Sequence, residues 1–464
     1  MVSSWRRSEG ASGAPQRVRV ASSAREQSAL SMILRFGWAV ADQLLSSATN
    51  FLLALFVART VTPRDLGAFS VAYATFTLSL GAVRAIAGEL LVVRHSHVSA
   101  DAWRHGIKGA AGTALMAGSG VGLAAAIAGW TVEGAFGTVL AIVGLSLPFL
   151  LVQDVWRFAF FARGRGGDAF LNDLVWAIVL FAAFGLLYQS GMTSVTWLVL
   201  AWAGAGVIAA IVGTWQLKTL PCSPRPAVKW LRSHSDLAPR FLAEFAVGTG
   251  VTNVTLFAIG AIAGLGELGR LRAGEIALGP LNVLFAGVGL VATAEGVRLL
   301  HESPRRLVQG CRRLSGVMAA GVLTWGALLL LVPREIGQSV LRDNWDGART
   351  LAPLLLFALA GYGSSFGALI GLRSLAAASR SLRAKCIDGA MTAVFCLLGA
   401  YWAGAIGVAW GTLVTGCLRS VNAWWQFSSA LHEHERRQEP GNTAVPPSTT
   451  VAHVPSSGYR AMEE

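Results

Sequence analysis

Charged residues are scarce in this chain of 464 residues: only 14% are Asp, Glu, Lys or Arg, whereas 54% are hydrophobic. A soluble protein normally carries about a quarter charged residues, and a disordered chain is poor in apolar ones. The mean hydropathy of +0.55 agrees with this shortage. Together these values exclude an ordinary soluble domain, an intrinsically disordered chain, a coiled coil and a collagen-like repeat.

Cysteines are also few, and none of them is spaced as in a metal site. No pair shows CxxC spacing and no histidine cluster lies beside them, so neither a zinc site nor a disulfide framework is expected. The sequence also lacks a nucleotide-binding loop and a Ser/His/Asp set. We therefore expect a protein that is not an enzyme and that uses no cofactor and no metal. The five cysteines are Cys222, Cys311, Cys386, Cys396 and Cys417.

The apolar residues that are present gather into runs of about 20, the length that crosses a hydrocarbon layer of roughly 30 Å as a helix. We expect an all-α integral membrane protein with about twelve transmembrane helices. The longest connections, near 218–240 and 334–349, leave no room for a soluble domain. The expected spans are 36–58, 67–93, 107–130, 137–162, 170–189, 195–217, 241–263, 271–297, 314–333, 350–372, 384–403 and 406–428.

Both ends of the chain are polar. The basic segment 1–35 contains Arg6-Arg7, as in a twin-arginine signal, but no long apolar run follows until Phe36. Its Arg/Ser-rich, acid-poor composition also suits an organellar transit peptide. We favour a disordered cytoplasmic tail for 1–35. The Pro/Ser/Thr-rich segment 429–464 is interpreted as a second disordered tail.

The basic residues predict the orientation. When the N-terminus is placed in the cytoplasm, 28 of the 38 Lys and Arg residues fall in inner segments and six in outer ones. Such an excess is typical of cytoplasmic loops, so both termini are expected on the cytoplasmic side of the plasma membrane. The same placement explains the net charge of +13 and argues against nucleic-acid binding.

The two halves of the membrane region share short motifs in the same order, about 202–210 residues apart. An offset of six spans preserves orientation, so we expect parallel repeats related by an axis along the membrane normal. The predicted six-helix bundles are 36–217 and 241–428, joined by a cytoplasmic linker at 218–240. The matched motifs begin at Thr49 and Thr252, Asp65 and Glu267, Pro148 and Pro353, Ala201 and Ala409, and Trp215 and Trp425.

The segment Ala58-Arg59-Thr60-Val61-Thr62-Pro63-Arg64-Asp65-Leu66-Gly67-Ala68-Phe69 resembles the A-R-x-L-x-P-x-x-Y/L-G-x-F opening of polysaccharide-export flippases. These are O-antigen-type, lipid-linked oligosaccharide transporters of the multidrug/oligosaccharidyl-lipid/polysaccharide (MOP) exporter superfamily. Gly81-Ala82-Val83-Arg84 and Gly269-Arg270-Leu271-Arg272-Ala273 lie where that family also has recurrent Gly and Arg positions. The resemblance covers about residues 35–428, with Val61 at the usual Leu position.

The resemblance implies two six-helix bundles around a central cavity. Rocking of the bundles would move a saccharide linked to a polyprenyl diphosphate carrier from the inner to the outer leaflet, for cell-surface polysaccharide biosynthesis. Membrane lipids, glycosyltransferases and a polymerase of the same pathway are the partners that the resemblance implies.

Ionisable and amide side chains inside the spans are the candidate substrate-binding residues, because a charge in a membrane helix usually faces a cavity or a partner. Arg84 has no acid three or four residues away, so an anion such as a diphosphate is its expected partner. Asp42, Gln43 and Asn50 share one face of the first span. The full set is Arg84, Arg157, Arg272, Asp42, Gln43, Asn50, Asn253 and Glu275.

Structural roles remain open for several of these residues. Asp154 and Arg157, like Arg272 and Glu275, are three apart and suited to local ion pairs. The polar stripe of the first span is equally suited to hydrogen bonds between helices. Three other charges lie close to predicted span ends and are interpreted as structural: Asp173, Asp388 and Arg419.

Two alternative functions remain. A drug/cation antiporter of the same superfamily would need a coupling carboxylate, for which Asp42 or Glu244 is suited. A membrane glycopolymer polymerase or ligase would normally need a long outer loop with catalytic residues, whereas the longest outer connection here is 334–349.

Overall fold

The computed structural model describes residues 14–96, 98–220 and 224–438, and in these ranges it contains helices and no strands. The first half comprises α1 (Ala14–Thr60), α2 (Pro63–Val83), the π-helical turn η1 (Arg84–Gly88), α3 (Glu89–His95), α4 (Ala100–Thr131), α5 (Ala135–Ala162), α6 (Gly166–Gln189) and α7 (Val195–Leu217).

The second half begins with α8 (Pro224–Ser233), α9 (Ala238–Phe245), the π-helical turn η2 (Ala246–Gly250), α10 (Val251–Ala263), α11 (Leu265–Ala277) and α12 (Gly279–Glu302). It continues with α13 (Pro304–Leu331), α14 (Arg334–Leu341), the 3-10 turn η3 (Arg342–Asn344), α15 (Trp345–Ser374) and α16 (Ala378–Gln438).

Eleven helical stretches of the described residues are long and apolar enough to cross a membrane. The last of them reverses direction inside α16, because Ala403 and Gly404 have non-helical backbone angles and Gly404 has a φ of 56°. Beyond the reversal the backbone folds back, and Asn422 donates a hydrogen bond to the carbonyl of Ala384 at 3.2 Å. This stretch therefore contains two of the expected spans, 384–403 and 406–428, and the all-α membrane fold is confirmed.

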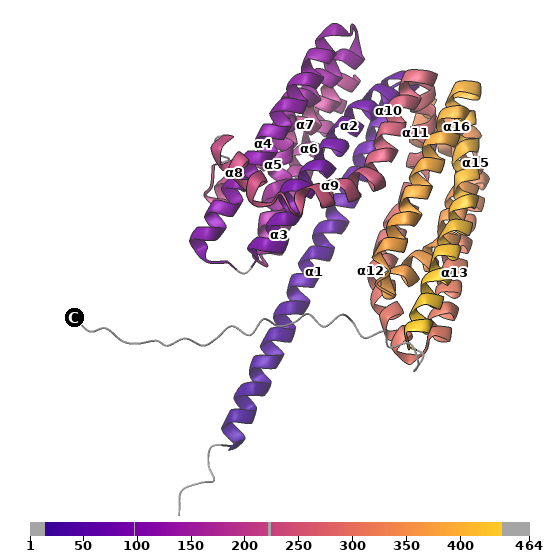
Figure 1. Ribbon diagram of the computed structural model, residues 1–464. Coiled ribbons are helices and arrows are strands. Elements are labelled where there is room, and N and C mark those ends of the chain that lie inside the picture. Colours follow the sequence, from indigo (N-terminus) through magenta and orange to yellow (C-terminus); the bar gives the residue numbers. More distant parts are fainter. Residues whose placement is uncertain (1–13, 97, 221–223, 439–464) are drawn as a thin grey trace, which may run out of the picture.

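The helices form two lobes that approach each other at the top of Figure 1 and diverge toward the bottom, where α1 begins. In the first lobe α5 packs between α4 and α7; in the second α15 packs between α13 and α16. One apolar core is built around Trp156 and Phe160 of the first lobe and extends to Trp345 of the second. Another is built around Leu355 and Phe366 of the second lobe. We call the side at which α1 begins the inner side, following the predicted orientation.

The two lobes meet at the outer side, where the backbones of α2 and α11 pack directly against each other. A Cβ added to Gly67 of α2 would lie 1.8 Å from the carbonyl oxygen of Leu265, and one added to Gly269 of α11 would lie 1.7 Å from that of Pro63. No residue larger than glycine fits either position without displacing the partner helix. We call this meeting of α2 and α11 the outer contact.

A second link at the outer side is made by Asn344 of η3. Its buried side-chain amide donates hydrogen bonds to the carbonyls of Ala58 and Val61, at 2.7 and 2.8 Å. Ala58 lies in the last turn of α1 and Val61 directly follows the helix, and the last acceptors of a helix have no intrahelical partners. The second lobe thus satisfies the end of the first helix.

The structure corrects the expected N-terminal tail. Residues 14–35, interpreted as disordered, form the first part of the 47-residue helix α1, because beyond Pro15 this segment contains good helix formers and neither Gly nor Pro up to Arg35. Residues 1–13 of that tail and 439–464 of the other lie outside the described residues. Residues 429–438 of the second expected tail continue α16 as a helix.

The expected span 271–297 is not one continuous helix. It divides between α11 and α12, which meet at Leu278. Pro280 follows closely and has no N–H to continue the hydrogen-bond ladder, so a new helix begins there.

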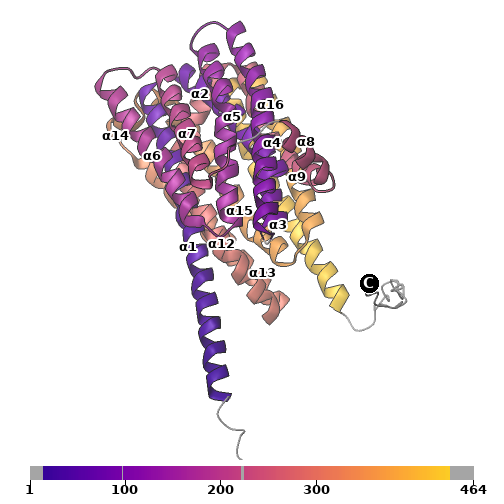
Figure 2. The same ribbon diagram turned by 90° about the vertical axis from the view of Figure 1, so that its left-hand side faces the viewer.

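The linker 218–240 is largely ordered. Figure 2 shows its helix α8 beside α4, against which it packs. Trp230 of α8 donates a hydrogen bond to the carbonyl of Ile86 in η1 at 2.9 Å. Arg94 at the end of α3 pairs with Asp236, and this hydrogen bond holds the pKa of the Asp236 carboxyl below its usual value.

Candidate functional site

A cavity of about 940 Å³ lies between the lobes, lined by residues from both. Most of its lining comes from the inner halves of the spans, while the outer contact lies beyond its opposite end. We call the lining residues of α1–α7 the N wall and those of α9–α16 the C wall. Two π-helical turns border the cavity: η1 begins at Arg84 and η2 contains Gly248 and Thr249. Such turns are frequent at functional sites because they re-aim side chains.

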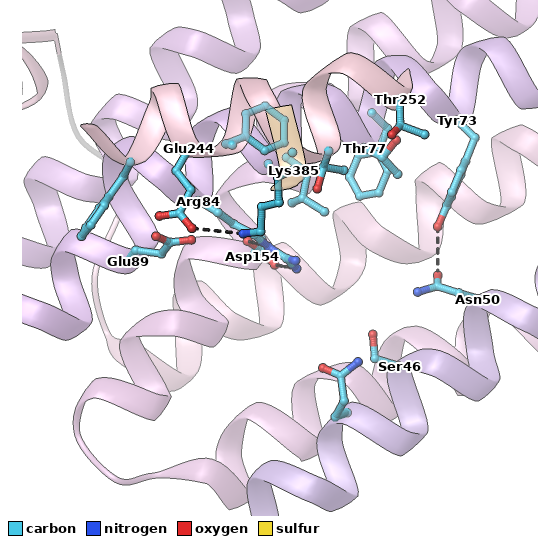
Figure 3. A pocket seen from close by; sticks show the side chains of 18 of the residues that line it. Ser46, Asn50, Tyr73, Thr77, Arg84, Glu89, Asp154, Glu244, Thr252 and Lys385 are labelled. Carbon is cyan, nitrogen blue, oxygen red and sulfur yellow. Dashed lines mark hydrogen bonds and ion pairs between the residues drawn. The ribbon is translucent and has the colours of Figure 1, made fainter. Parts of the chain in front are cut away.

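Arg84 of the N wall binds Asp154 of α5 with two parallel hydrogen bonds, Nε to Oδ2 at 2.8 Å and Nη2 to Oδ1 at 2.6 Å (Figure 3). The Asp154 side chain is 6% exposed and that of Arg84 35% exposed. The expectation that Arg84 lacks an acidic partner is therefore wrong. Its partner lies on another helix, which spacing along one helix does not reveal.

Arg157 also pairs across helices. It donates to the fully buried carboxylate of Asp42 in α1, with Nε at 2.8 Å from Oδ2, and lies 3.4 Å from Asp173 of α6. Arg157 and Asp154 thus bind different partners rather than each other, and the expected local pair is not formed. Asp173, interpreted as a charge near a span end, instead lines the cavity and accepts a hydrogen bond from Gln153 at 3.0 Å.

Gln43 and Asn50 of the predicted stripe face the cavity, whereas Asp42 is buried behind it against Arg157. We call the cavity-facing polar residues of α1 the amide and hydroxyl stripe. Its members Gln43, Ser46, Thr49 and Asn50 all line the cavity. Asn50 also accepts a hydrogen bond from the Tyr73 hydroxyl of α2 at 3.3 Å (Figure 3). The stripe therefore both faces the cavity and joins helices.

Aromatic rings lie next to this stripe in the N wall. Trp202 of α7 lies 5.6 Å from Tyr73 and 5.1 Å from Phe76, measured between ring centroids. Trp176 of α6 is 6.4 Å from Trp202, and its buried indole N–H has no hydrogen-bond partner among the described residues. Flat apolar faces beside amides and hydroxyls suit a ligand with both hydroxyl groups and C–H surfaces.

The remaining expected residues lie outside the lining. Asn253 of α10 accepts a hydrogen bond from Thr77 at 2.9 Å and so links the lobes, while its neighbour Thr252 lines the cavity. Arg272 and Glu275 of α11 form the expected pair at 2.6 Å. Neither member is among the lining residues.

The C wall was largely missed from the sequence. Lys385 of α16 lies 3.3 Å from Glu244 of α9 (Figure 3), and Arg419 lies 3.3 Å from Asp388. Asp388 and Arg419, interpreted as charges near span ends, thus lie deep enough to line the cavity, together with Arg373 at the end of α15. The sequence could have indicated this wall, because the expected span 384–403 contains Lys385, Asp388 and Thr392 at spacings that place them on one helix face.

No protein-family model matches this sequence, and no curated protein is similar to it in sequence. Solved structures are similar in fold. The structure of a multidrug resistance MATE family transporter of the MOP superfamily in its inward-facing conformation aligns with a TM-score of 0.64 and 11% identity, over 84% of this chain and 95% of that one. Lipid II flippase MurJ in an inward closed conformation aligns with a TM-score of 0.65 and 12% identity, over 86% and 91%.

An outward-facing MATE family transporter of the same superfamily aligns with a lower TM-score of 0.50, at 12% identity, over 85% of this chain and 94% of that one. This chain therefore has the two-lobe, all-helical fold that the MATE and MurJ transporters share.

Proposed function

We propose that this protein is a flippase of the MOP type, which moves a lipid-carrier-linked saccharide across the plasma membrane by alternating access. The observation that carries the proposal is the composition of the cavity: a volume of about 940 Å³ with an amide and hydroxyl stripe, aromatic rings and several cations. A saccharide joined to a polyprenyl diphosphate has hydroxyl groups, C–H faces and an anionic link, and each finds a matching group in the walls. The fold similarity to a lipid II flippase supports the same conclusion.

Alternating access is supported by the arrangement of the two lobes. Their outer ends meet through glycine backbone, and the cavity lies on the inner side of that contact. A headgroup arriving from the inner leaflet reaches the cavity directly, whereas release on the outer side requires the outer contact to open. Rigid-body movement of packed lobes is an ordinary way for such a transporter to exchange access.

The acids of the N wall favour a drug/cation antiporter as the second candidate. Glu89, Asp154 and Asp173 line the cavity and Asp42 lies directly behind it. Against this candidate, three of these carboxylates are already bound to Arg84 or Arg157. A cationic drug would have to displace a guanidinium from each of them.

Transport by the purified full chain in proteoliposomes tests the proposal. The probe is a polyprenyl diphosphate that carries one N-acetylhexosamine with a fluorescent label on the sugar. We expect probe from the inner leaflet to become accessible to a membrane-impermeant quencher, whereas empty liposomes keep it protected. Movement of ethidium with no movement of this lipid would refute the proposal and support the antiporter.

A further inference from the structure

The two walls of the cavity differ in their charge. Among the lining residues, the N wall carries the cations Arg84 and Arg157 against the acids Glu89, Asp154 and Asp173. Asp42, buried behind Arg157, adds another acid to this wall. An anionic group approaching the N wall therefore meets more negative than positive charge.

The balance is reversed on the C wall, where three cations face two acids. The acids are Glu244 and Asp388, and the cations are Arg373, Lys385 and Arg419. Because charges in a narrow cavity are screened less than on an open surface, this difference directs an anion toward the C wall.

Arg373 differs from every other cation of the lining because its side chain forms no ion pair or hydrogen bond with any described residue. It is exposed at the inner end of α15, one residue before the helix ends at Ser374. Its guanidinium has five N–H donors in a planar fork that matches two phosphate oxygens. This side chain can bind an anion without first giving up a partner.

Lys385 and Arg419 are held more weakly than the arginines of the N wall. Lys385 makes a single contact with Glu244 at 3.3 Å, and their side chains are 43% and 61% exposed. Exposed pairs of this kind contribute little to stability, so an anionic ligand can replace the acid. Arg419 is 3.3 Å from Asp388, and its guanidinium lies over the Tyr362 ring at 5.6 Å.

The three cations follow the path from the inner mouth into the cavity. Arg373 lies at the mouth, where α15 ends, and Lys385 lies about two turns inside the start of α16. Arg419 lies at the depth of Asp388, one turn beyond Lys385. A headgroup leaving the inner leaflet meets these cations in that order.

We propose that the diphosphate of the lipid-linked substrate binds the C wall, first at Arg373 and Lys385 and then at Arg419, while the sugar lies against the amide, hydroxyl and aromatic groups of the N wall. This assignment rests on the proposed flippase function. It gives Arg84 and Arg157 the task of holding the N wall together, since their guanidinium groups are committed to Asp154 and Asp42.

Binding of farnesyl diphosphate to the full chain in lipid nanodiscs, measured by calorimetry, tests the assignment. We expect Arg373→Ala combined with Lys385→Ala to raise the Kd about tenfold or more, because two charge-assisted contacts are lost. Arg383→Ala is the matched control. Arg383 is exposed on α16, the helix that carries Lys385, forms no ion pair or hydrogen bond with a described residue, and does not line the cavity. This variant should bind like the wild type.

The other arms separate the possible failures. Inorganic diphosphate should compete with farnesyl diphosphate in the wild type and not in the double variant, which identifies the diphosphate as the bound group. The C-wall assignment is wrong if farnesyl diphosphate binds the wild type and the double variant equally. It is also wrong if binding is lost instead in a variant that combines Arg84→Ala with Asp154→Asn. In both cases the flippase proposal stands. If the wild type binds ethidium and no diphosphate, both proposals fall.

Discussion

Gly67 and Gly269 make reciprocal contacts: each packs against the carbonyl that lies four residues before the other. Reciprocity of this kind is what a two-fold axis produces, and the two glycines are counterparts in the internal repeat. We therefore expect residues 36–217 and 241–428 to superpose by a rotation about the membrane normal. An experimental structure with inverted or unrelated halves would contradict this.

Replacing either glycine should open the outer side. The Cβ of Gly269→Ala would collide with the Pro63 carbonyl, which costs the closed arrangement on the order of 1–3 kcal/mol. A cysteine at Thr252 of the cavity should then react about tenfold faster with an impermeant maleimide added from outside. Gly266→Ala is the control, because a Cβ at Gly266 meets nothing within 4 Å. Equal labelling in both variants would rule out the outer contact as a gate.

Removing the Asn344 amide should weaken the attachment of η3 to α1. Asn344→Ala leaves the carbonyls of Ala58 in α1 and of Val61 just after it without their donor, at a cost of about 1–3 kcal/mol. We expect a lower melting temperature of the purified protein by scanning fluorimetry. Asp343→Ala, at the exposed neighbouring position, should leave the melting temperature unchanged.

Arg84→Ala should lower the amount of folded protein, because it leaves the buried carboxylate of Asp154 without its cation, a loss of about 2–4 kcal/mol. Combining it with Asp154→Ala should restore most of the abundance, measured by fluorescence-detected size exclusion. Arg104→Ala, at an exposed position, serves as the control. Wild-type abundance of the single variant would show that the pair does not stabilise the N wall.

The orientation is tested by labelling single cysteines in a cysteine-free background. A cysteine at Ser190 or Asp343 should react with an impermeant reagent from outside, and one at Ser235 should react only after the cells are opened. All three positions are exposed in the structure. Protection of Ser190 and Asp343 in intact cells would overturn the predicted topology.

Hydropathy predicted the membrane helices well because span length depends on local composition. The expected break between 403 and 406 coincides with the reversal at Ala403 and Gly404. The break between α11 and α12 was missed, since an apolar run continues across Pro280. A window of hydropathy does not detect a lost backbone hydrogen bond.

Charge pairing was predictable only within one helix. Arg272 and Glu275 are three residues apart and form the expected pair. Arg84 and Asp154 are 70 residues apart, and Arg157 and Asp42 are 115 apart, so their meeting depends on how helices pack. Helical periodicity identifies which side chains share a face and does not identify the opposing face.

The hydrogen bonds of Asn344 also constrain the order in which the chain is assembled. The amide that completes the end of α1 lies 286 residues after Ala58, so it leaves the ribosome only when most of the protein has already been inserted. Until then the carbonyls at the outer end of the first helix depend on water or other donors, and that end reaches its final contacts only after η3 has been made.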